Sequence, residues 1–439
     1  MKNIYSLILI TFLYSNAFAQ YNLGTTYGNN NDLNASRYQP SELDLGDKRF
    51  QIGINYYLWM GNNTFNYANI KKAYDTKNID FLSPIANKEN MLGVGQDYQL
   101  LGVAYQHQND EGKNFTFGFS IVDKIAMNFK YSDNYLKLAL KGNKQFAGRK
   151  TNLGTTTINA NYSREFVLSS ALPVFGTNDK GLRFGFRAKL IQGLAGIYMP
   201  KGEASIITEE NGRYIDMDFD YAIYTSGLTS FSFTKGKGLG LGIDLGLTYN
   251  INEKFEISAS ALDLGYITYK SNTRSYEKTG SGRYEGLVID NLFGGMEKNI
   301  DSANAIIDAN QTIDKKFTMP LGSRICVEAE YKTPKKYKAN NRISSNSIFL
   351  TYIQGLNNNP GAISKPFVSV AYNYDIHKFF DAGIMASYGG YNKFAAGLFL
   401  SANFNQLVKL GISSDNLIPF IAPKYGTGID FAANFSISF

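Results

Sequence analysis

The sequence predicts an all-β protein, a transmembrane antiparallel β-barrel of about fourteen strands with one or two short helices in its loops or at its mouth. Three observations predict this fold. Apolar and polar residues alternate strictly along many segments, several of these segments run to roughly 10–12 residues, and the less apolar face is rich in Gly, Ser and Asn. A soluble β-sandwich also alternates, but its strands are typically about 5–6 residues long and its core face is bulky.

The first nineteen residues predict a signal peptide. Lys2 precedes the apolar stretch 4–13, and Ala17-Phe18-Ala19 provides small residues at the two positions that a signal peptidase recognises. We therefore expect cleavage after Ala19 and export from the cytoplasm. The expected division is a signal peptide (1–19), an N-terminal periplasmic segment (20–48) and an outer-membrane barrel (49–439).

The alternation is clearest in residues 239–250. Every odd position there is apolar or aromatic, and every even position is Gly, Asp, Thr or Asn. Because successive side chains of a strand point to opposite faces, one face would contact lipid and the other a polar interior. Similar segments predict strands near 49–59, 97–107, 114–130, 156–168, 181–193, 239–250, 254–262, 317–331, 346–355, 366–375, 380–388, 393–403, 406–413 and 429–439.

Four short connections set the expected orientation: Asn109–Asn114, Asn250–Lys254, Asp375–Lys378 and Asn405–Gln406. Barrels of this class have short turns on the periplasmic side, so both termini are expected there. Residues 213–234 would add a hairpin and raise the count to sixteen, but we place them outside the membrane.

The last strand ends on Phe439 after outward-facing Phe435 and Ile437. This ending resembles the C-terminal signal that the bacterial barrel-assembly machinery reads, which implies that machinery as a partner during biogenesis.

Three further segments interrupt the strand pattern. Residues 60–96 do not alternate, and residues 332–342 are basic and are interpreted as a solvated turn. Residues 289–309 carry apolar residues at helical spacing, which predicts an amphipathic helix that either packs on a long loop or acts as a gate.

The sequence gives little support for catalysis, a metal or a cofactor. The single cysteine excludes disulfides within the chain and multi-cysteine zinc sites, and two histidines exclude a His-rich metal site. Asp216, Asp218 and Asp220 resemble the start of a calcium loop, but Tyr221 and Gly227 stand where an EF-hand needs Gly and a bidentate acid. These aspartates are better interpreted as the wet face of a strand. Without a Ser-His-acid set or a basic cluster, neither an enzyme nor a nucleic-acid partner is expected.

Several charged residues are predicted to face the lumen because they alternate with apolar residues on their strands. They are Arg183, Arg187, Lys189, Asp244, Arg324, Glu328 and Glu330. They form either a structural network that closes the lumen or the lining of a polar path that selects a solute. Whether they meet depends on the order of strands around the barrel.

Three short motifs stand out: residues 240–249 followed by 252–265, Gly61–Asn66, and Pro320–Arg324. They resemble an uncharacterised Bacteroidota outer-membrane family related to FadL-like and PorV-like barrels. The resemblance implies a fourteen-strand barrel related to fatty-acid channels and to a shuttle protein of type IX secretion. Residues 20–48 depart from the transporters, because they are too few and too polar for an N-terminal hatch.

These observations predict an outer-membrane barrel, in contact with lipids and lipopolysaccharide, that passively passes a small or hydrophobic solute. The alternative is a docking or assembly subunit of a secretion or gliding complex. A channel predicts a continuous polar lumen, whereas a docking subunit predicts a plugged lumen and an exposed apolar patch on the rim.

Overall fold

The computed structural model describes residues 21, 23–28, 32–76, 89–177, 180–229, 232–284, 310–333, 336–338, 342–344, 346–377, 379–404 and 407–439. The expected signal peptide and the expected helix at 289–309 lie outside these residues. No helix in the described part is long and apolar enough to cross a membrane.

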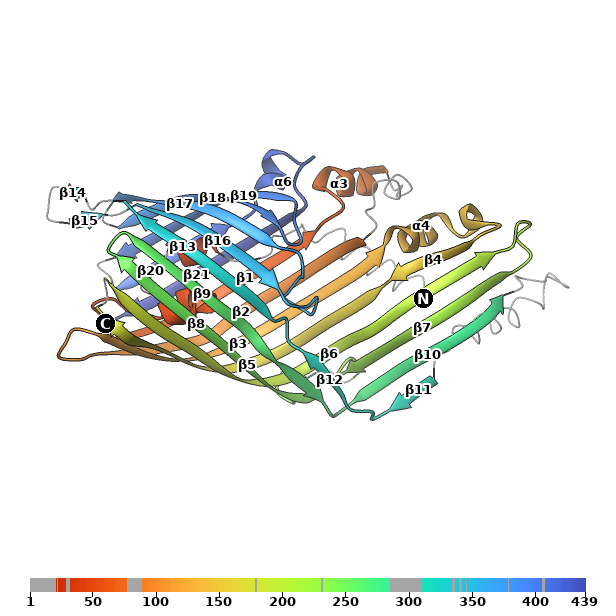
Figure 1. The fold of residues 1–439 in the computed structure, drawn as a ribbon, viewed down its shortest axis with the longest axis horizontal. Coiled ribbons are helices and arrows are strands. Elements are labelled where there is room, and N and C mark those ends of the chain that lie inside the picture. The colour runs from red at the N-terminus through yellow and green to blue at the C-terminus, as the bar shows by residue number, and fades with distance from the viewer. Residues whose placement is uncertain are drawn as a thin grey trace.

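Fourteen antiparallel strands form a closed ring (Figure 1). Each strand pairs with the strand that follows it in the ring. The ring closes because residues 428–438 of the last strand pair with residues 51–61 of the first. In this order the strands are β1 (Phe50–Asn62), β2 (Glu89–Gln108), β3 (Asn114–Ser132), β5 (Thr157–Gly176), β6 (Gly181–Thr208), β8 (Gly238–Asn252), β9 (Phe255–Tyr269), β13 (Arg324–Lys332), β16 (Ser347–Gly355), β17 (Phe367–His377), β18 (Phe380–Gly389), β19 (Phe394–Phe404), β20 (Val408–Ser414) and β21 (Gly428–Ser438). The predicted fold and strand count are confirmed.

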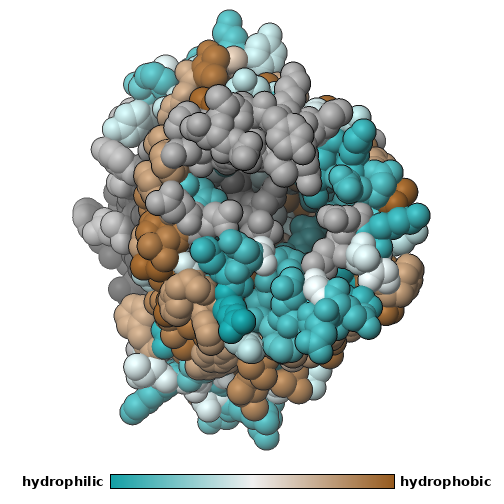
Figure 2. All heavy atoms as spheres, turned by 90° about the vertical axis from the view of Figure 1, so that its left-hand side faces the viewer, coloured by the Kyte–Doolittle hydropathy of each residue, from teal (hydrophilic) through white to brown (hydrophobic). Residues whose placement is uncertain are grey.

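The alternation read from the sequence appears as alternating exposure. Along β8 the odd residues from Leu239 to Tyr249 are exposed, and the even residues between them from Gly240 to Thr248 are buried. Each of the fourteen strands carries at least one exposed large apolar or aromatic side chain. Figure 2 shows brown apolar residues along the outer wall and teal polar residues around a hollow near the centre of one end.

The two ends of the barrel differ. Short connections at 109–113 and 253–254 lie at the end that carries the C terminus, which we call the short-turn end. The strands β5 and β6 also meet at this end, although residues 178–179 lie outside the described part. The predicted connections near 375–378 and 405–406 close at this end too, although residues 378 and 405–406 lie outside the described part. In the basic segment at this end, β14 (Lys336–Lys338) and β15 (Arg342–Ser344) form a small hairpin.

The opposite, long-loop end carries α3 (Tyr67–Thr76), α4 (Asp133–Lys141), η4 (Lys144–Phe146) and α6 (Ile418–Ile421). A sheet also projects beyond the ring there, where β6 continues beside β4 (Lys150–Thr155) and β7 (Ile215–Ser226), and β7 pairs with β10 (Thr273–Tyr284). The strand β11 (Asn310–Ile313) pairs with β10. The hairpin at 213–234 therefore does not enter the ring.

One predicted strand is interrupted. Residues 317–331 form β12 (Phe317–Pro320) and β13, both paired with β9, with residues 321–323 between them outside any strand. Pro320 lacks an amide hydrogen for a continuous ladder, and a Cβ on Gly322 would collide with the backbone of Pro360, so the chain bends where the wall meets an inner loop.

Candidate functional site

The lumen is filled by the described N-terminal residues 21, 23–28 and 32–45, which we call the plug. It contains α2 (Gly24–Gly28), η1 (Leu33–Arg37) and η2 (Pro40–Glu42). Polar groups of the plug bond to small polar residues of the inner wall. Ser41 and Thr248 share a hydroxyl hydrogen bond of 2.7 Å, the Ser436 hydroxyl donates to Asp32 at 2.6 Å, and the Leu23 amide donates to Asp415 at 2.8 Å. Glycine also makes room, because a Cβ on Gly246 would lie 2.8 Å from Pro40 Cδ.

One side of the plug packs on apolar wall residues. Tyr27 stacks on Phe349 with ring centroids 4.5 Å apart, and Tyr21 meets the Phe367 ring edge-on at 5.1 Å. These residues belong to a buried cluster from the plug, β9, β13 and β16–β19: Tyr21, Leu23, Tyr27, Tyr38, Leu262, Cys326, Phe349, Ile353, Phe367, Ala371, Met385 and Phe399. The wall under the plug therefore carries large apolar side chains on this side, between small polar ones such as Thr351 and Ser369, and is mainly polar on the side of β1, β3 and β8.

This position differs from our expectation that residues 20–48 form a periplasmic segment too polar for a hatch. Polarity is what allows the described part to lie inside, since a buried polar group is tolerated when it finds a hydrogen-bond partner. Those partners lie up to 404 positions away in the chain, as for Asp32 and Ser436, so the sequence pattern did not reveal them.

The loop between β16 and β17 folds inward from the other end. Ala362 and Ile363 are fully buried. The Asn128 side-chain amide donates to the Ala362 carbonyl at 2.7 Å, Tyr391 donates to the same oxygen at 2.9 Å, and Arg324 donates to the Gly361 carbonyl at 2.8 Å. The lumen is thus closed by the plug and by this inner loop.

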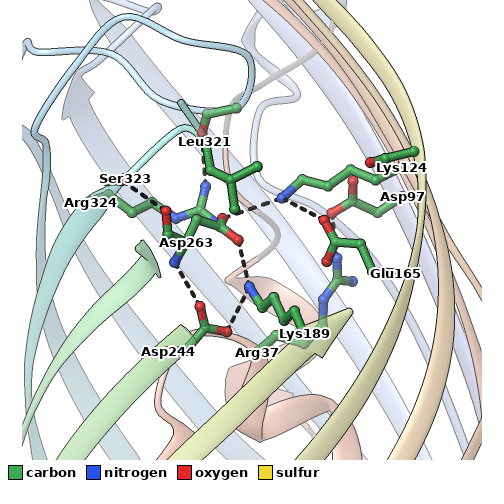
Figure 3. A network of polar contacts seen from close by, with 12 residues as sticks. Arg37, Asp97, Lys124, Glu165, Lys189, Asp244, Asp263, Leu321, Ser323 and Arg324 are labelled. Atoms are coloured by element: carbon green, nitrogen blue, oxygen red, sulfur yellow. Dashed lines mark hydrogen bonds and ion pairs between the residues drawn. The ribbon is translucent and has the colours of Figure 1, made fainter. Parts of the chain in front are cut away.

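A cavity of about 40 Å³, which we call the central chamber, lies against both closures. Its charged lining comes from the plug, β2, β3, β5, β6, β8, β9 and β13. The five basic residues are Arg37, Lys124, Arg187, Lys189 and Arg324, and the four acidic ones are Asp97, Glu165, Asp244 and Asp263. Most of these side chains point toward one another in Figure 3.

Asp263 is the centre of this network. Its carboxylate lies 2.5 Å from Lys189, 3.2 Å from Lys124 and 3.1 Å from Arg324 (Figure 3). Asp263 has a positive φ of 54° at a shift in the β8–β9 register, and its amide donates to Asp244 at 2.6 Å. Aspartate is among the few non-glycine residues that adopt this conformation readily, so the bend places the carboxylate among three cations.

The structure places the seven predicted lumen residues on the inner face and brings four of them together. Lys189 and Arg187 approach Asp244 at 2.7 and 3.4 Å, and Arg324 joins them through Asp263. Arg183 instead pairs with Asp44 of the plug.

The two predicted glutamates lie apart from this network, nearer the short-turn end of β13. Glu328 accepts a hydrogen bond from Thr351 at 2.5 Å, and Glu330 lies 3.3 Å from Lys332. Their separation from the chamber follows from the strand rise, since they lie four and six residues beyond Arg324 on the same face.

The sequence reasoning missed Asp263, Lys124, Glu165, Arg37 and Asp97 as site residues. Arg37 pairs with Asp97 at 2.5 Å, which joins the plug to β2. Asp263 lies within the motif at residues 252–265, and its unusual backbone conformation breaks the alternation on which the other assignments rest.

The remaining candidates have structural partners. Asp216 and Asp218 lie on β7 and pair with Arg283 and Lys150 at 2.6 and 2.9 Å. No group of three or more His, Cys, Asp or Glu in the described residues could hold a metal ion. Phe435, Ile437 and Phe439 are exposed at the end of the chain, where the Phe439 carbonyl accepts the Phe50 amide at 2.8 Å.

Several solved structures are similar to this chain at low sequence identity. The toluene transporter TodX of Pseudomonas putida has 10% identity and a TM-score of 0.42, covering 97% of this chain and 99% of that one. The toluene transporter TbuX of Ralstonia pickettii has 9% identity and a TM-score of 0.44, covering 92% of this chain and 93% of that one. A FadL homologue of Pseudomonas aeruginosa has 10% identity and a TM-score of 0.42, covering 96% of this chain and 98% of that one.

No curated protein matches the chain. A family model does match residues 45–415, which is most of the barrel. The protein belongs to the family of unknown function DUF5723.

Proposed function

We propose that this protein is a β-barrel of the bacterial outer membrane that the plug holds closed, and that it passes a small, partly hydrophobic solute when the plug leaves the lumen. Exposed apolar side chains on all fourteen strands support the membrane location, because a soluble protein rarely exposes so continuous an apolar surface. Export with removal of residues 1–19, and contact with lipids and lipopolysaccharide, are part of this proposal.

The observation that carries the proposal is the wall beneath the plug. With Tyr21, Leu23 and Tyr27 withdrawn, the apolar side chains of β16–β19 would face the lumen opposite a polar wall. Such a path suits a solute that has an apolar part and a polar part. The described contacts that attach the plug to the wall are non-covalent, so its release requires no covalent bond to break.

Solute flux into proteoliposomes tests this function. Tyr27→Ala removes a buried ring that anchors the plug, while the membrane-facing wall stays unchanged. Truncating a buried aromatic side chain typically lowers stability by about 3–5 kcal/mol, and here the closed state is the one that loses this stability. Phenylalanine and serine are suitable probes, because their zwitterionic groups slow direct passage through the bilayer.

We expect the wild type to admit both amino acids slowly and Tyr27→Ala to admit phenylalanine faster than serine. Tyr388→Ala is the matched control, because its ring is exposed on the outside of β18. Absence of flux in all three proteins would contradict the proposal.

A second function, a docking subunit of an outer-membrane complex such as type IX secretion, is favoured by the long-loop end. Around α6, Phe420 is 61% exposed, Ile421 76% and Tyr425 70%. A plugged lumen together with these apolar side chains fits a subunit that binds a partner. Absence of flux together with co-purification of a secretion subunit that is lost in Ile421→Asp would favour docking.

A further inference from the structure

Four glutamates gather where the plug meets the inner face of β9 and β13, and we call them the carboxylate cluster: Glu42, Glu256, Glu328 and Glu330. Glu256 and Glu330 are direct register partners across these strands, and Ser258 and Glu328 form the next pair on the same face. Side chains directly opposite each other on one face have Cβ atoms about 5 Å apart. The wall therefore presents three glutamates close together beside Ser258.

Glu42 is the contribution of the plug to this cluster. It ends η2, and its carboxyl group accepts a hydrogen bond from Ser258, which places it beside Glu328. Burial, together with the charges of Glu328, Glu256 and Glu330, raises the pKa of Glu42 well above its ordinary value. Because Glu42 moves with the plug, all four carboxyl groups are crowded together only in the closed barrel.

Positive charge compensates this cluster only in part. Lys332 of β13 is the cation that contacts it within the described part of the chain, 3.5 Å from Glu256 and 3.3 Å from Glu330. Arg183 of β6 also reaches the plug, but it pairs with Asp44. The other inner-face charges of the strands packed on η2 lie in the central chamber: Glu165 of β5, Arg187 and Lys189 of β6, and Asp244 of β8. Four carboxyl groups therefore share one cation, and the buried Oε1 of Glu330 has no hydrogen-bond partner in the described structure.

Two other titratable side chains face the cluster. Tyr27 of the plug shares a hydroxyl hydrogen bond of 2.5 Å with Thr351, which donates to Glu328. Burial raises the pKa of Tyr27 well above its ordinary value, so this hydroxyl stays neutral near pH 7. Cys326 of β13 lies two residues before Glu328 on the same face. Neither group supplies the positive charge that the cluster lacks.

We propose that the carboxylate cluster is a proton-sensitive latch for the plug. Closing the plug onto β9 and β13 takes up at least one proton from the solvent, which the four carboxyl groups share, and opening returns it to the solvent. The physical reason is that like charges brought together in a protein interior are costly, and a proton removes one of them. This latch rests on the proposed function in one respect, because it requires that the plug can leave the lumen.

The direction of the pH dependence follows from the raised pKa of Glu42. The closed state binds the proton more tightly than the open state, so its extra stability is fully present below the ordinary glutamate pKa. That stability is lost as the pH rises through the raised value. Each proton released on opening can increase the ratio of open to closed barrels by up to about tenfold per pH unit.

A second carboxylate under the plug acts with the same sign. Asp415, which follows β20, accepts the Leu23 and Gly24 amides at 2.8 and 3.1 Å, and its own amide donates to Asp430 at 2.6 Å. Burial raises the pKa of Asp415 to about 7. A change at Glu42 should therefore weaken the pH dependence of opening without abolishing it.

Alkylation of a cysteine under the plug measures opening without any solute flux. Ala171 of β5 is fully buried in a cluster with Leu33 and Leu43 of the plug. In the folded protein in lipid vesicles, with Cys326→Ser and Ala171→Cys, dilute iodoacetamide reacts at a rate proportional to the open fraction. Dividing this rate by that of an exposed Glu210→Cys thiol at the same pH removes the pH dependence of the thiol itself.

We expect the corrected rate to rise at least about tenfold from pH 6 to pH 8.5 when Glu42 is present. Glu42→Gln carries a neutral amide that resembles the protonated acid, so it should react more slowly at pH 8.5 and show a rise at least about threefold smaller. Glu111→Gln, in an exposed turn, is the matched control and should keep the full rise. Glu328→Gln should behave like Glu42→Gln and replaces it if that variant does not fold.

The outcomes separate the latch from the passage. A corrected rate that does not rise with pH, an equal rise with and without Glu42, or faster reaction of Glu42→Gln at every pH would overturn the latch. Amino-acid flux is measured in the same vesicles. A rise that Glu42→Gln reduces, without flux at any pH, would support the latch and contradict the proposed passage, whereas no alkylation at any pH would overturn both.

Discussion

Two glycines of the inner wall provide a direct way to displace the plug. Gly185 of β6 and Gly246 of β8 are paired and both face η2. A Cβ on Gly246 would lie 2.8 Å from Pro40 Cδ, and ordinary contacts begin at 3.4 Å, so Gly246→Ala requires a shift of 3.4 − 2.8 = 0.6 Å. A Cβ on Gly185 would collide with the backbone of Pro40 and Ser41, so Gly185→Ala requires a larger shift.

The plug should move rather than the wall. Gly185 lies in a strand that is hydrogen-bonded on both sides, to β5 and β8, whereas η2 has no strand partner. Overpacking of this kind costs about 1–3 kcal/mol. If the closed state bears this cost, the ratio of open to closed barrels rises by roughly 5-fold in Gly246→Ala and up to roughly 150-fold in Gly185→Ala.

Single-channel recording in planar bilayers measures this ratio as open probability. Gly118→Ala is the matched control, because the atom nearest to its Cβ would be the flexible end of Leu33, at 3.2 Å. We expect open probability to rise in the order wild type, Gly246→Ala, Gly185→Ala, with Gly118→Ala near the wild type. Equal silence in all four proteins would refute the reasoning that the plug gates the lumen.

Three other predictions follow from the same geometry. Asp263→Ala leaves Lys124, Lys189 and Arg324 without their shared carboxylate, so the free energy of unfolding measured in urea titrations should fall by about 3–5 kcal/mol. A loss below about 1 kcal/mol would show that Asp263 does not hold the network together. Leu241→Arg places a charge on the outer face of β8 and should cost about 2–4 kcal/mol in lipid vesicles, whereas an unchanged stability would mean that this face does not contact lipid. The Arg283 hydrogen bonds hold the pKa of Asp216 below its usual value, so their stabilisation of the β7–β10 pair is present above the ordinary aspartate pKa and is lost as the pH falls below it. Hydrogen exchange of β7, corrected for the intrinsic rate, should therefore accelerate in acid in the wild type and change less in Arg283→Gln.

The barrel could be predicted from the sequence because its signal is local. Residues 239–250 alternate within one strand, and a similar pattern recurs in the other thirteen. The number of strands and the face to which each side chain points could therefore be predicted without knowing any contact between strands. The break at 321–323 was missed because alternation continues across it in the sequence while the backbone bends toward the inner loop.

The plug and the chamber depend on pairings between distant residues. Arg187 and Asp244 are register partners, but a shift of one residue would have separated them. No sequence pattern indicates that Asp44 pairs with Arg183, because the two residues lie 139 positions apart. The inner face of each strand was therefore predictable, whereas the identity of its partners was not.

Disulfide cross-linking tests the central claim, that the N-terminal segment fills the lumen. The Ser41 and Thr248 hydroxyl oxygens are 2.7 Å apart, so cysteines at these positions bring two sulfur atoms within bonding reach. With Cys326→Ser removing the natural thiol, the Ser41→Cys, Thr248→Cys protein in membranes should form the cross-link on mild oxidation. Ser41→Cys with Leu247→Cys, whose second thiol faces outward, should not. No cross-link with Thr248→Cys, or an equal yield from both pairs, would contradict a plugged barrel.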